Sequence, residues 1–312
     1  MSRAFVFPGQ GAQTIGMGRD LADAYPAARA VFQEVDDALG DDLSGLIWSG
    51  DADQLTLTRN AQPALMATSI AALRALQAEG ITVADHADFV AGHSLGEYSA
   101  LVAAGSITLP DAARLLRIRG EAMQSAVPVG VGAMAALLGL GFEDAKAVAE
   151  EAAQGQVCTA ANDNDPSQVV VSGHREAVER ALDIAKERGA KRAMLLPVSA
   201  PFHCALMEPA ARAMAEALDD VEIERPTVPL IANVTAQPVT DTHLIRSLLV
   251  DQVTGSVRWR ESVAAMADHG VTEIWEIGAG KALSGMIRRI DKSIATRNIG
   301  TSADVTAAKE AL

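Results

Sequence analysis

The sequence predicts an α/β protein with a mainly parallel sheet in its core and an inserted small subdomain of the ferredoxin-like type. Two observations support this fold class. Short apolar segments of strand length alternate with segments of helical periodicity over most of the 312 residues, and this alternation is typical of a parallel sheet covered by helices. Between residues 134 and 198 the order becomes strand, helix, strand, strand, helix, strand, which is the ferredoxin-like order.

The first part of the core is expected to begin with a buried strand that runs into a glycine-rich loop, Pro8-Gly9-Gln10-Gly11. A later helical run has Pro63 near its start and Gly80 just beyond its end, which are typical boundary positions for these residue types. The elements expected here are strands at 4–7 and 88–91 and helices at 19–25, 27–39, 62–77 and 111–124.

The small subdomain is expected to consist of strands at 134–140, 157–161, 168–172 and 193–198 and helices at 143–153 and 175–188. After it the chain returns to the core, with a helix from residue 209, strands near 230–233 and 273–277, and helices near 257–269 and 281–290. We therefore expect residues 1–127 and 198–312 to form the core and residues 128–197 to form the small subdomain.

The bulk composition excludes several classes of protein. With 49% hydrophobic residues the chain is long and apolar enough to fold around a large core. Its formal net charge of −14 repels phosphodiester backbones and anionic membranes, so neither nucleic acid nor a membrane is an expected partner. The longest apolar stretch and the apolar start of the chain are both too short for a membrane span or a signal peptide. We expect a cytosolic protein.

Residues 90–96 read Val-Ala-Gly-His-Ser-Leu-Gly and are the most informative segment of the chain. A short strand, a Gly-x-Ser-x-Gly turn and a helix together make a nucleophile elbow, which exposes the serine hydroxyl at a helix N-terminus. The backbone N–H of Leu95 and the helix dipole would both favour an oxyanion there. We therefore expect an α/β-hydrolase-like core in which Ser94 is the nucleophile.

His203 is the histidine best placed to act as a base for Ser94, titrating near neutral pH. It follows Pro197 and Pro201, which stiffen the exit from the last strand of the small subdomain, and clefts between domains are common ligand sites. The other histidines read as surface or capping residues, and His93 as a brace for the elbow. No acidic residue between Ser94 and His203 lies in a convincing context for the third member of a triad.

Two arginines, Arg117 and Arg119, lie on the helix expected at 111–124, and a guanidinium can hold a carboxylate through two parallel hydrogen bonds. Read alone, both fit a solvated helix face equally well. The two cysteines, Cys158 and Cys204, are widely separated without metal-binding spacing and read as buried free thiols. No glycine-rich segment has the context of a nucleotide-binding loop.

Five segments, in this order, resemble the malonyl-CoA:acyl carrier protein transacylases, an acyltransferase family of fatty-acid and polyketide synthesis. They are Phe-Pro-Gly-Gln-Gly-Ala-Gln at 7–13, Gly-His-Ser-Leu-Gly-Glu-Tyr-Ser at 92–99, Arg-Gly at 119–120 with Met-Gln at 123–124, residues 197–207, and Gln252 ahead of Val-Arg-Trp at 257–259. The resemblance spans nearly the whole chain.

The resemblance implies a role for each site residue. Ser94 would be the acylated nucleophile, His203 its base and Arg119 the clamp on the malonyl carboxylate. The backbone amides of Gln10 and Leu95 would form the oxyanion hole, and the main-chain carbonyl of Gln252 would orient His203. The implied cycle is ping-pong and uses malonyl-CoA and an acyl carrier protein as partners. It needs no metal and no redox cofactor, and the enzyme is expected to be a monomer.

Two positions depart from the family pattern, because Ala12 and Phe202 stand where many members carry serine. In related modular acyltransferases a phenylalanine beside the base accompanies selection of malonyl over methylmalonyl groups, so Phe202 is expected to contact the substrate. The same machinery would make an esterase or thioesterase if water attacked the acyl-enzyme, but such an enzyme has no use for a cation facing the acyl group. A carrier-binding scaffold without activity is disfavoured because both Ser94 and His203 are present.

Overall fold

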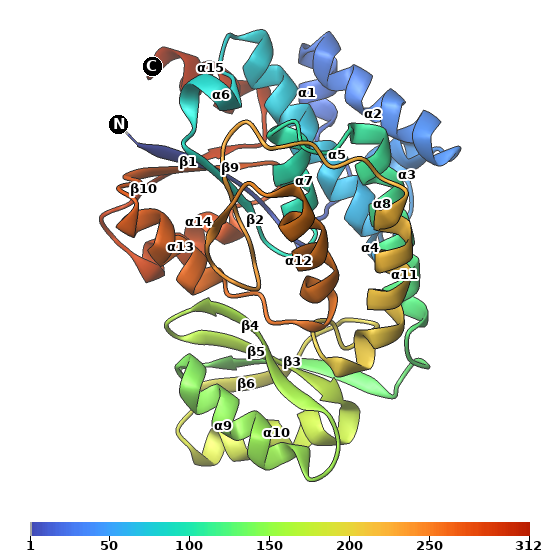
Figure 1. The fold of residues 1–312 in the computed structure, drawn as a ribbon, viewed down its shortest axis with the longest axis vertical. Coiled ribbons are helices and arrows are strands. Elements are labelled where there is room, and N and C mark those ends of the chain that lie inside the picture. The colour runs from blue at the N-terminus through green and yellow to red at the C-terminus, as the bar shows by residue number, and fades with distance from the viewer. Residues whose placement is uncertain (1) are drawn as a thin grey trace.

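The computed structural model describes residues 2–312, which form a large lobe and a small lobe (Figure 1). The large lobe contains a six-stranded sheet in the order β10-β9-β1-β2-β7-β8. Its strands are β1 (Arg3–Phe7), β2 (Phe89–Gly92), β7 (Leu230–Ile231), β8 (Pro238–Val239), β9 (Glu273–Ile277) and β10 (Ala295–Ile299). Neighbouring strands run parallel except β7 and β8.

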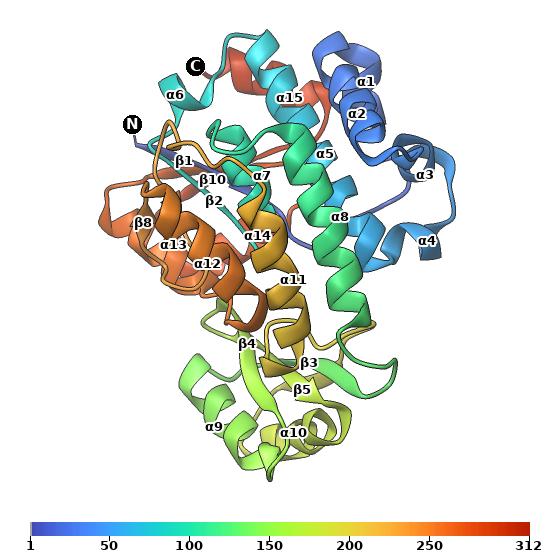
Figure 2. The same ribbon diagram turned by 45° about the vertical axis from the view of Figure 1, so that its right-hand side comes forward.

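Helices cover the large sheet on both faces (Figures 1 and 2). The β1 strand is wholly buried, and its Phe5 stacks on Trp275 of β9 with ring centroids 5.4 Å apart. The helices of this lobe are α1 (Arg19–Ala24), α2 (Pro26–Leu39), α3 (Leu43–Ser49), α4 (Ala52–Thr56), α5 (Thr58–Ala78), α6 (Val83–His86), α7 (Gly96–Ala103), α8 (Leu109–Ser125), α11 (Glu208–Asp219), α12 (Thr242–Thr254), α13 (Trp259–Asp268), α14 (Ala282–Ile290) and α15 (Ser302–Glu310).

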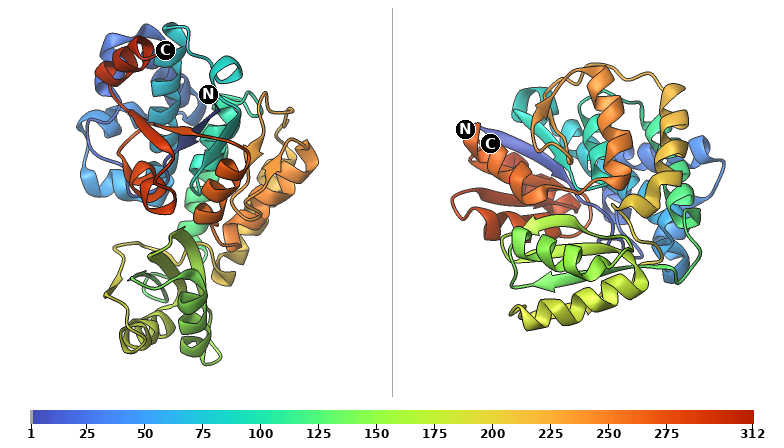
Figure 3. Two further views of the ribbon diagram at one scale, coloured as in Figure 1. Left: turned by 90° about the vertical axis from the view of Figure 1, so that its left-hand side faces the viewer. Right: turned by 60° about the horizontal axis from the view of Figure 1, so that its bottom comes forward.

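The small lobe is an antiparallel four-stranded sheet, in the order β4-β5-β3-β6, with two helices packed on one face (Figure 3). Its elements, in chain order, are β3 (Gly132–Leu138), α9 (Phe142–Ala153), β4 (Cys158–Asp165), β5 (Gln168–His174), α10 (Arg175–Glu187) and β6 (Arg192–Leu195). This is the ferredoxin-like arrangement, so both parts of the predicted fold class are confirmed. The exact residues at which the lobes divide stay a prediction.

The two lobes are joined along β4 by charge pairs as well as by the chain itself. Asp163 and Asp165, both with fully buried side chains, pair with Arg260 of α13 and Arg289 of α14 at 2.8 Å. Asn162 forms a parallel β-bridge with Val257 of the large lobe. These contacts fix the small sheet against the side of the large lobe that carries the end of β2.

The structure differs from the sequence-based elements mainly where polar helices and short strands were overlooked. Helix α5 begins at Thr58 and continues through Pro63, its sixth residue, which lacks the N–H group that would otherwise bond to the Arg59 carbonyl. The elements that no predicted range covered are α3, α4, α6, α12, α15, β8 and β10. Within residues 2–312, no helix is both long and apolar enough to cross a membrane.

Replacement of Gly92 by alanine should destabilise the protein by several kcal/mol, the range for a forced overlap inside a packed core. A Cβ at Gly92 would overlap the backbone of Gly96, where the elbow closes most tightly. Urea unfolding of the parent and G92A measures the change. G141A is the matched control, since a Cβ at Gly141 meets no atom within 4 Å. Equal stability of G92A and the parent would contradict the tight packing of the elbow.

Candidate active site

The predicted elbow is present, and Ser94 lies between the end of β2 and the start of α7 with a φ of 53°. Such a left-handed backbone is costly for a residue with a side chain, so surrounding contacts must maintain it. Asn233, just after β7, provides two of them: its Oδ1 accepts from the Ser94 amide at 2.8 Å, and its Nδ2 donates to the Gly92 carbonyl at 2.7 Å. The strain presents the hydroxyl of Ser94 to the space between the lobes.

His203 lies against Ser94, as predicted. The Ser94 Oγ and His203 Nε2 atoms are 2.8 Å apart, and His203 Nδ1 is 2.9 Å from the main-chain carbonyl oxygen of Gln252. Because that carbonyl can only accept, it holds the proton on Nδ1 and leaves Nε2 free to accept the serine proton. His203 is itself in the left-handed region, with a φ of 58°.

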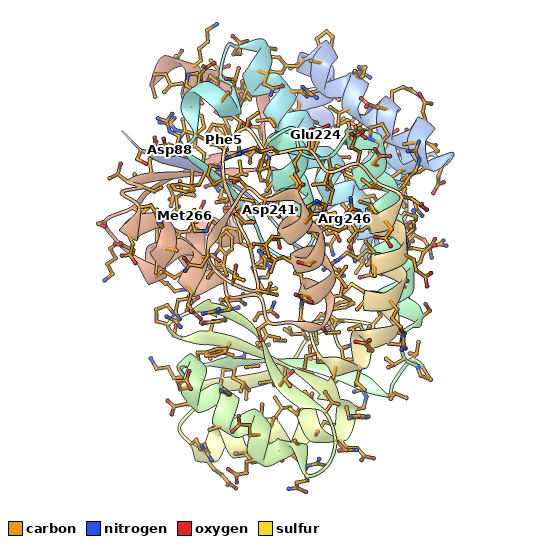
Figure 4. All side chains as sticks on the ribbon, viewed as in Figure 1. Phe5, Asp88, Glu224, Asp241, Arg246 and Met266 are labelled. Atoms are coloured by element: carbon orange, nitrogen blue, oxygen red, sulfur yellow. The ribbon has the colours of Figure 1, made fainter. Side chains whose placement is uncertain are left out.

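Gln252 lies in the last turn of α12, and contacts outside the site hold the first half of this helix in place. Asp241 caps the start of this helix by accepting from the Leu244 amide at 2.8 Å, and Arg246 donates to the Val221 carbonyl at 2.8 Å. Figure 4 labels both Asp241 and Arg246. A carbonyl in the last turn of a helix has no partner within the helix, so it is available to His203.

The environment of His203 keeps its imidazole neutral. Burial, and secondarily the nearby Arg119 cation, lowers the pKa of His203 from its ordinary value of 6.5 to about 3. The expectation of a base titrating near neutral pH is therefore wrong for the free protein. A buried imidazole beside a cation is neutral at every physiological pH and can act as a base without first losing a proton.

Arg119 points into the site from α8 and is 1% exposed. Its guanidinium donates to Ser94 Oγ at 3.2 Å, to Gln62 Oε1 at 2.7 Å and to Gln252 Oε1 at 2.8 Å, and its Nε–H group has no partner among the described residues. Arg117 leaves the same helix in another direction and pairs with Asp41. The structure thus separates the two arginines that the helical pattern left equivalent, and the one in the site is the one that the resemblance named.

A cleft of about 490 Å³ opens over Ser94 between the lobes. Gln10, Leu95 and Phe202 line it, and among the described residues neither the Gln10 nor the Leu95 amide donates a hydrogen bond within the chain. Two free N–H groups beside a nucleophile are what an oxyanion hole requires. Phe202 is 9% exposed and presents its ring to the cleft next to His203.

Three polar residues of the site were missed by sequence reasoning: Gln62, Glu97 and Asn233. Glu97 belongs to the elbow segment itself and is buried, with its pKa raised to about 8 by desolvation. Gln62 and Asn233 carry no sequence signal, since they reach the site from α5 and from the turn after β7. For Arg119 there was a signal, because it falls on the same buried stripe of α8 as Leu116 and Met123.

Residues 2–312 contain no group of three or more His, Cys, Asp or Glu side chains placed to hold a metal ion. His93 lies beside the nucleophile and its Nε2 is 2.9 Å from Asn164 Oδ1 of β4. It therefore braces the elbow against the small lobe. Cys158 and Cys204 are both free and buried, as predicted.

Comparison with known proteins gives consistent results. The family model described as acyl transferase domain matches residues 4–298. A malonyl CoA-acyl carrier protein transacylase of Bacillus subtilis is 49% identical, over 94% of this chain and 92% of its own length. The protein of the same description from Escherichia coli K12 is 47% identical over 98% of each chain.

Solved structures show the same similarity in three dimensions. An acyl-carrier-protein S-malonyltransferase from Bartonella henselae is 55% identical, covers 100% of this chain and 99% of its own, and superposes with a TM-score of 0.97. A structure described as a type II PKS acyl-carrier protein in complex with its malonyl-transacylase is 43% identical over 100% of both chains, with a TM-score of 0.97.

The lowered pKa of His203 predicts a distinctive pH dependence for the reactivity of Ser94. A base with the ordinary pKa of about 6.5 would be mostly protonated at pH 5, and the rate of serine modification would fall roughly 25-fold from pH 7. Here His203 stays neutral across that interval, so the rate at which a sulfonyl fluoride modifies Ser94 should be nearly level between about pH 5 and pH 7. A titration midpoint near 6.5 in that profile would contradict the assigned environment of His203.

Proposed function

Because this chain belongs to the acyl transferase domain family, we propose that it transfers a malonyl group from malonyl-CoA to the phosphopantetheine thiol of an acyl carrier protein. The observation that best supports this function is the position of the Ser94 hydroxyl. Its Oγ lies 2.8 Å from His203 Nε2 and 3.2 Å from the Arg119 guanidinium, so one atom contacts both the base and the cation. The activity serves fatty-acid or polyketide synthesis. Free, buried cysteines suit the reducing cytosol, which is the proposed compartment.

The first half-reaction forms an acyl-enzyme. Ser94 Oγ attacks the thioester carbonyl carbon while His203 Nε2 takes the hydroxyl proton, and the resulting oxyanion accepts hydrogen bonds from the Gln10 and Leu95 amides. The carbon–sulfur bond then breaks, and His203 gives the proton to the departing CoA thiolate. Malonate is left as an ester on Ser94.

The second half-reaction reverses these steps with a different thiol. His203 takes the proton of the carrier's pantetheine thiol, the sulfur attacks the ester carbonyl, and Ser94 Oγ leaves and recovers the proton. No change of oxidation state occurs, and the chain's own residues supply every proton transfer. CoA leaves before the carrier reacts, so the cycle is ping-pong.

Arg119 accounts for the choice of acyl group. A malonyl ester on Ser94 has its free carboxylate two carbons from the carbonyl, within reach of a guanidinium that already contacts Oγ. Among the described residues the direct partners of Arg119 are neutral, and its Nε–H has no partner. A malonyl carboxylate would supply the anion that this buried cation lacks.

Ser94→Ala should abolish acyl-enzyme formation without unfolding the protein, because the hydroxyl faces the cleft and fills no part of the core. Intact-mass analysis after mixing with malonyl-CoA provides the test: the parent should gain one malonyl group and S94A none. A malonyl adduct that persists on S94A would show that another residue is the nucleophile.

Arg119→Ala should lower kcat/KM for malonyl-CoA about 10- to 150-fold relative to acetyl-CoA, since a charge-assisted hydrogen bond contributes about 1.5–3 kcal/mol. Acetyl-CoA has no carboxylate and should become a relatively better substrate. Arg119→Lys should recover little of the preference, because lysine keeps the charge without the planar fork.

Arg117→Ala is the matched control, since it removes a guanidinium from the same helix that pairs with Asp41 away from Ser94. Its malonyl-to-acetyl ratio should equal that of the parent. If the ratio fell in R117A and held in R119A, the clamp would have been assigned to the wrong arginine.

Carrier docking is proposed to use a local group of basic residues around the cleft between the lobes, because the carriers of this family are acidic and a protein of net charge −14 repels them at long range. The candidates are Lys191, Arg192, Lys281 and Arg288, all exposed. Arg288 donates to Thr296 of β10, so we expect it to matter least.

Charge reversal at Lys191, Arg192 or Lys281 should raise the KM for the carrier and flatten its salt dependence, while acylation of Ser94 by malonyl-CoA proceeds at the parent rate. Steady-state kinetics at two ionic strengths gives both quantities. Parent-like carrier kinetics in all three variants would remove this surface from consideration.

A further inference from the structure

A buried carboxyl group with no part in the mechanism above lies one layer behind the nucleophile. Glu97 is in the first turn of α7, three residues after Ser94, and is 1% exposed. Burying a carboxyl group is costly unless it is well hydrogen-bonded, so its contacts deserve an explanation.

Both oxygens of Glu97 face N–H donors. Oε2 accepts a short hydrogen bond from the side-chain amide of Gln252, and Oε1 lies 3.4 Å from the backbone amide of Asn233. Both hydrogen-bond partners recorded for this carboxyl group among the described residues are N–H donors. Its surroundings are therefore built for a group that accepts.

The amide of Gln252 connects this carboxyl group with the catalytic residues. Its Nε2 also donates to the Ser94 carbonyl at 3.0 Å, and its Oε1 accepts from Arg119 at 2.8 Å. If the amide turned over, its NH₂ group would meet the guanidinium, donor against donor, and its oxygen would meet the Glu97 oxygen. An acceptor at Glu97 thus fixes which end of the amide faces Arg119.

Ionisation of Glu97, which its raised pKa of about 8 places mainly above neutral pH, adds an electrostatic attraction for Arg119. The ionisable groups that raise the pKa of Arg119 against the effect of burial are Tyr98 and Glu97. Desolvation raises the pKa of Glu97, while Gln252, Asn233 and Arg119 lower it. Within residues 2–312 the guanidinium has no carboxylate in direct contact, so Glu97 acts on it across the Gln252 amide.

We propose that Glu97 is a positioning residue that holds the Arg119 guanidinium in place through the Gln252 amide, and so sets the enzyme's preference for acyl groups that end in a carboxylate. This inference rests on the proposed malonyl transfer and adds a selectivity determinant that never touches the substrate. Substitution of Glu97 should therefore lower kcat/KM for malonyl-CoA and leave the acylation of Ser94 by acetyl-CoA nearly unchanged.

The test is the ratio of kcat/KM for malonyl-CoA and acetyl-CoA in Glu97→Gln. Glutamine fits the space but brings an NH₂ group to a position surrounded by donors, so the Gln252 amide loses its fixed orientation. We expect the ratio to fall about tenfold, the effect of one net hydrogen bond, while kcat/KM for acetyl-CoA changes by less than about threefold. An unchanged ratio, or equal losses with both substrates, would overturn the proposal.

A double variant separates positioning from a general structural role. If Glu97 acts through Arg119, adding E97Q to R119A should leave the ratio where R119A alone puts it. A further drop in the double variant would overturn the proposal. Glu276→Gln makes the same change at another fully buried carboxyl group, one that accepts from the Leu283 and Ser284 amides at 3.0 and 2.7 Å, and should leave the ratio at the parent value.

If E97Q does not fold, Glu97→Asp takes its place, because it keeps the carboxyl group and withdraws the acceptor by one methylene. The ratio in E97D should fall in the same direction by a smaller factor, and a parent-like ratio would overturn the proposal. Failure of the parent protein to accept malonyl from malonyl-CoA would instead refute the proposed function, so the two failures can be told apart.

Discussion

The burial of one guanidinium beside the nucleophile is the constraint on which the rest of the site depends. Taking a cation out of water costs several kcal/mol, and the protein offsets this with Gln62, Gln252 and Ser94 as acceptors. None of these is an anion, so the positive charge of Arg119 is not neutralised by its direct partners, and a bound carboxylate can neutralise it. The same cation helps to lower the pKa of His203, which keeps the base neutral. Selectivity and basicity therefore have a common physical origin.

Gln252 unites the parts of this arrangement, because its main chain and side chain serve different partners. The carbonyl holds the His203 ring, while the amide bridges Arg119, Glu97 and the Ser94 carbonyl. In a Ser-His-Asp triad an acid contacts the imidazole, whereas here the main-chain carbonyl of Gln252 does, so no carboxylate of the described residues lies directly against His203. Such a carboxylate would raise the pKa of the histidine and compete with the malonyl group for the guanidinium. The carbonyl fixes the tautomer without adding charge.

Sequence reasoning located the fold class and the central pair of residues because those features are local. The elbow is a contiguous segment whose glycines meet steric demands, and the ferredoxin-like order can be followed along the chain. Helix α12, which carries Gln252, was missed although Ile245, Leu248, Leu249 and Val253 recur at helical spacing, because apolar residues also lie outside that buried stripe, at Leu244 and Val250. Asn233 and Gln62 could not have been found, since their roles depend on contacts with Ser94 and Arg119 across 139 and 57 residues of sequence. The resemblance chose Arg119 over Arg117, and the physical reason is the buried face of α8, because residues two apart on a helix point in different directions.

In a transferase of this kind the acyl-enzyme is stable to water and reacts with a thiol. The fate of that intermediate therefore tests the proposed function most directly. Protein loaded at Ser94 with radiolabelled malonyl-CoA is freed of CoA and divided between buffer alone and buffer with a pantetheinylated carrier protein. The account predicts that the label stays on the protein in buffer and moves to the carrier thiol when the carrier is added. Release of free malonate at the same rate in both samples would contradict it and would make the protein a thioesterase.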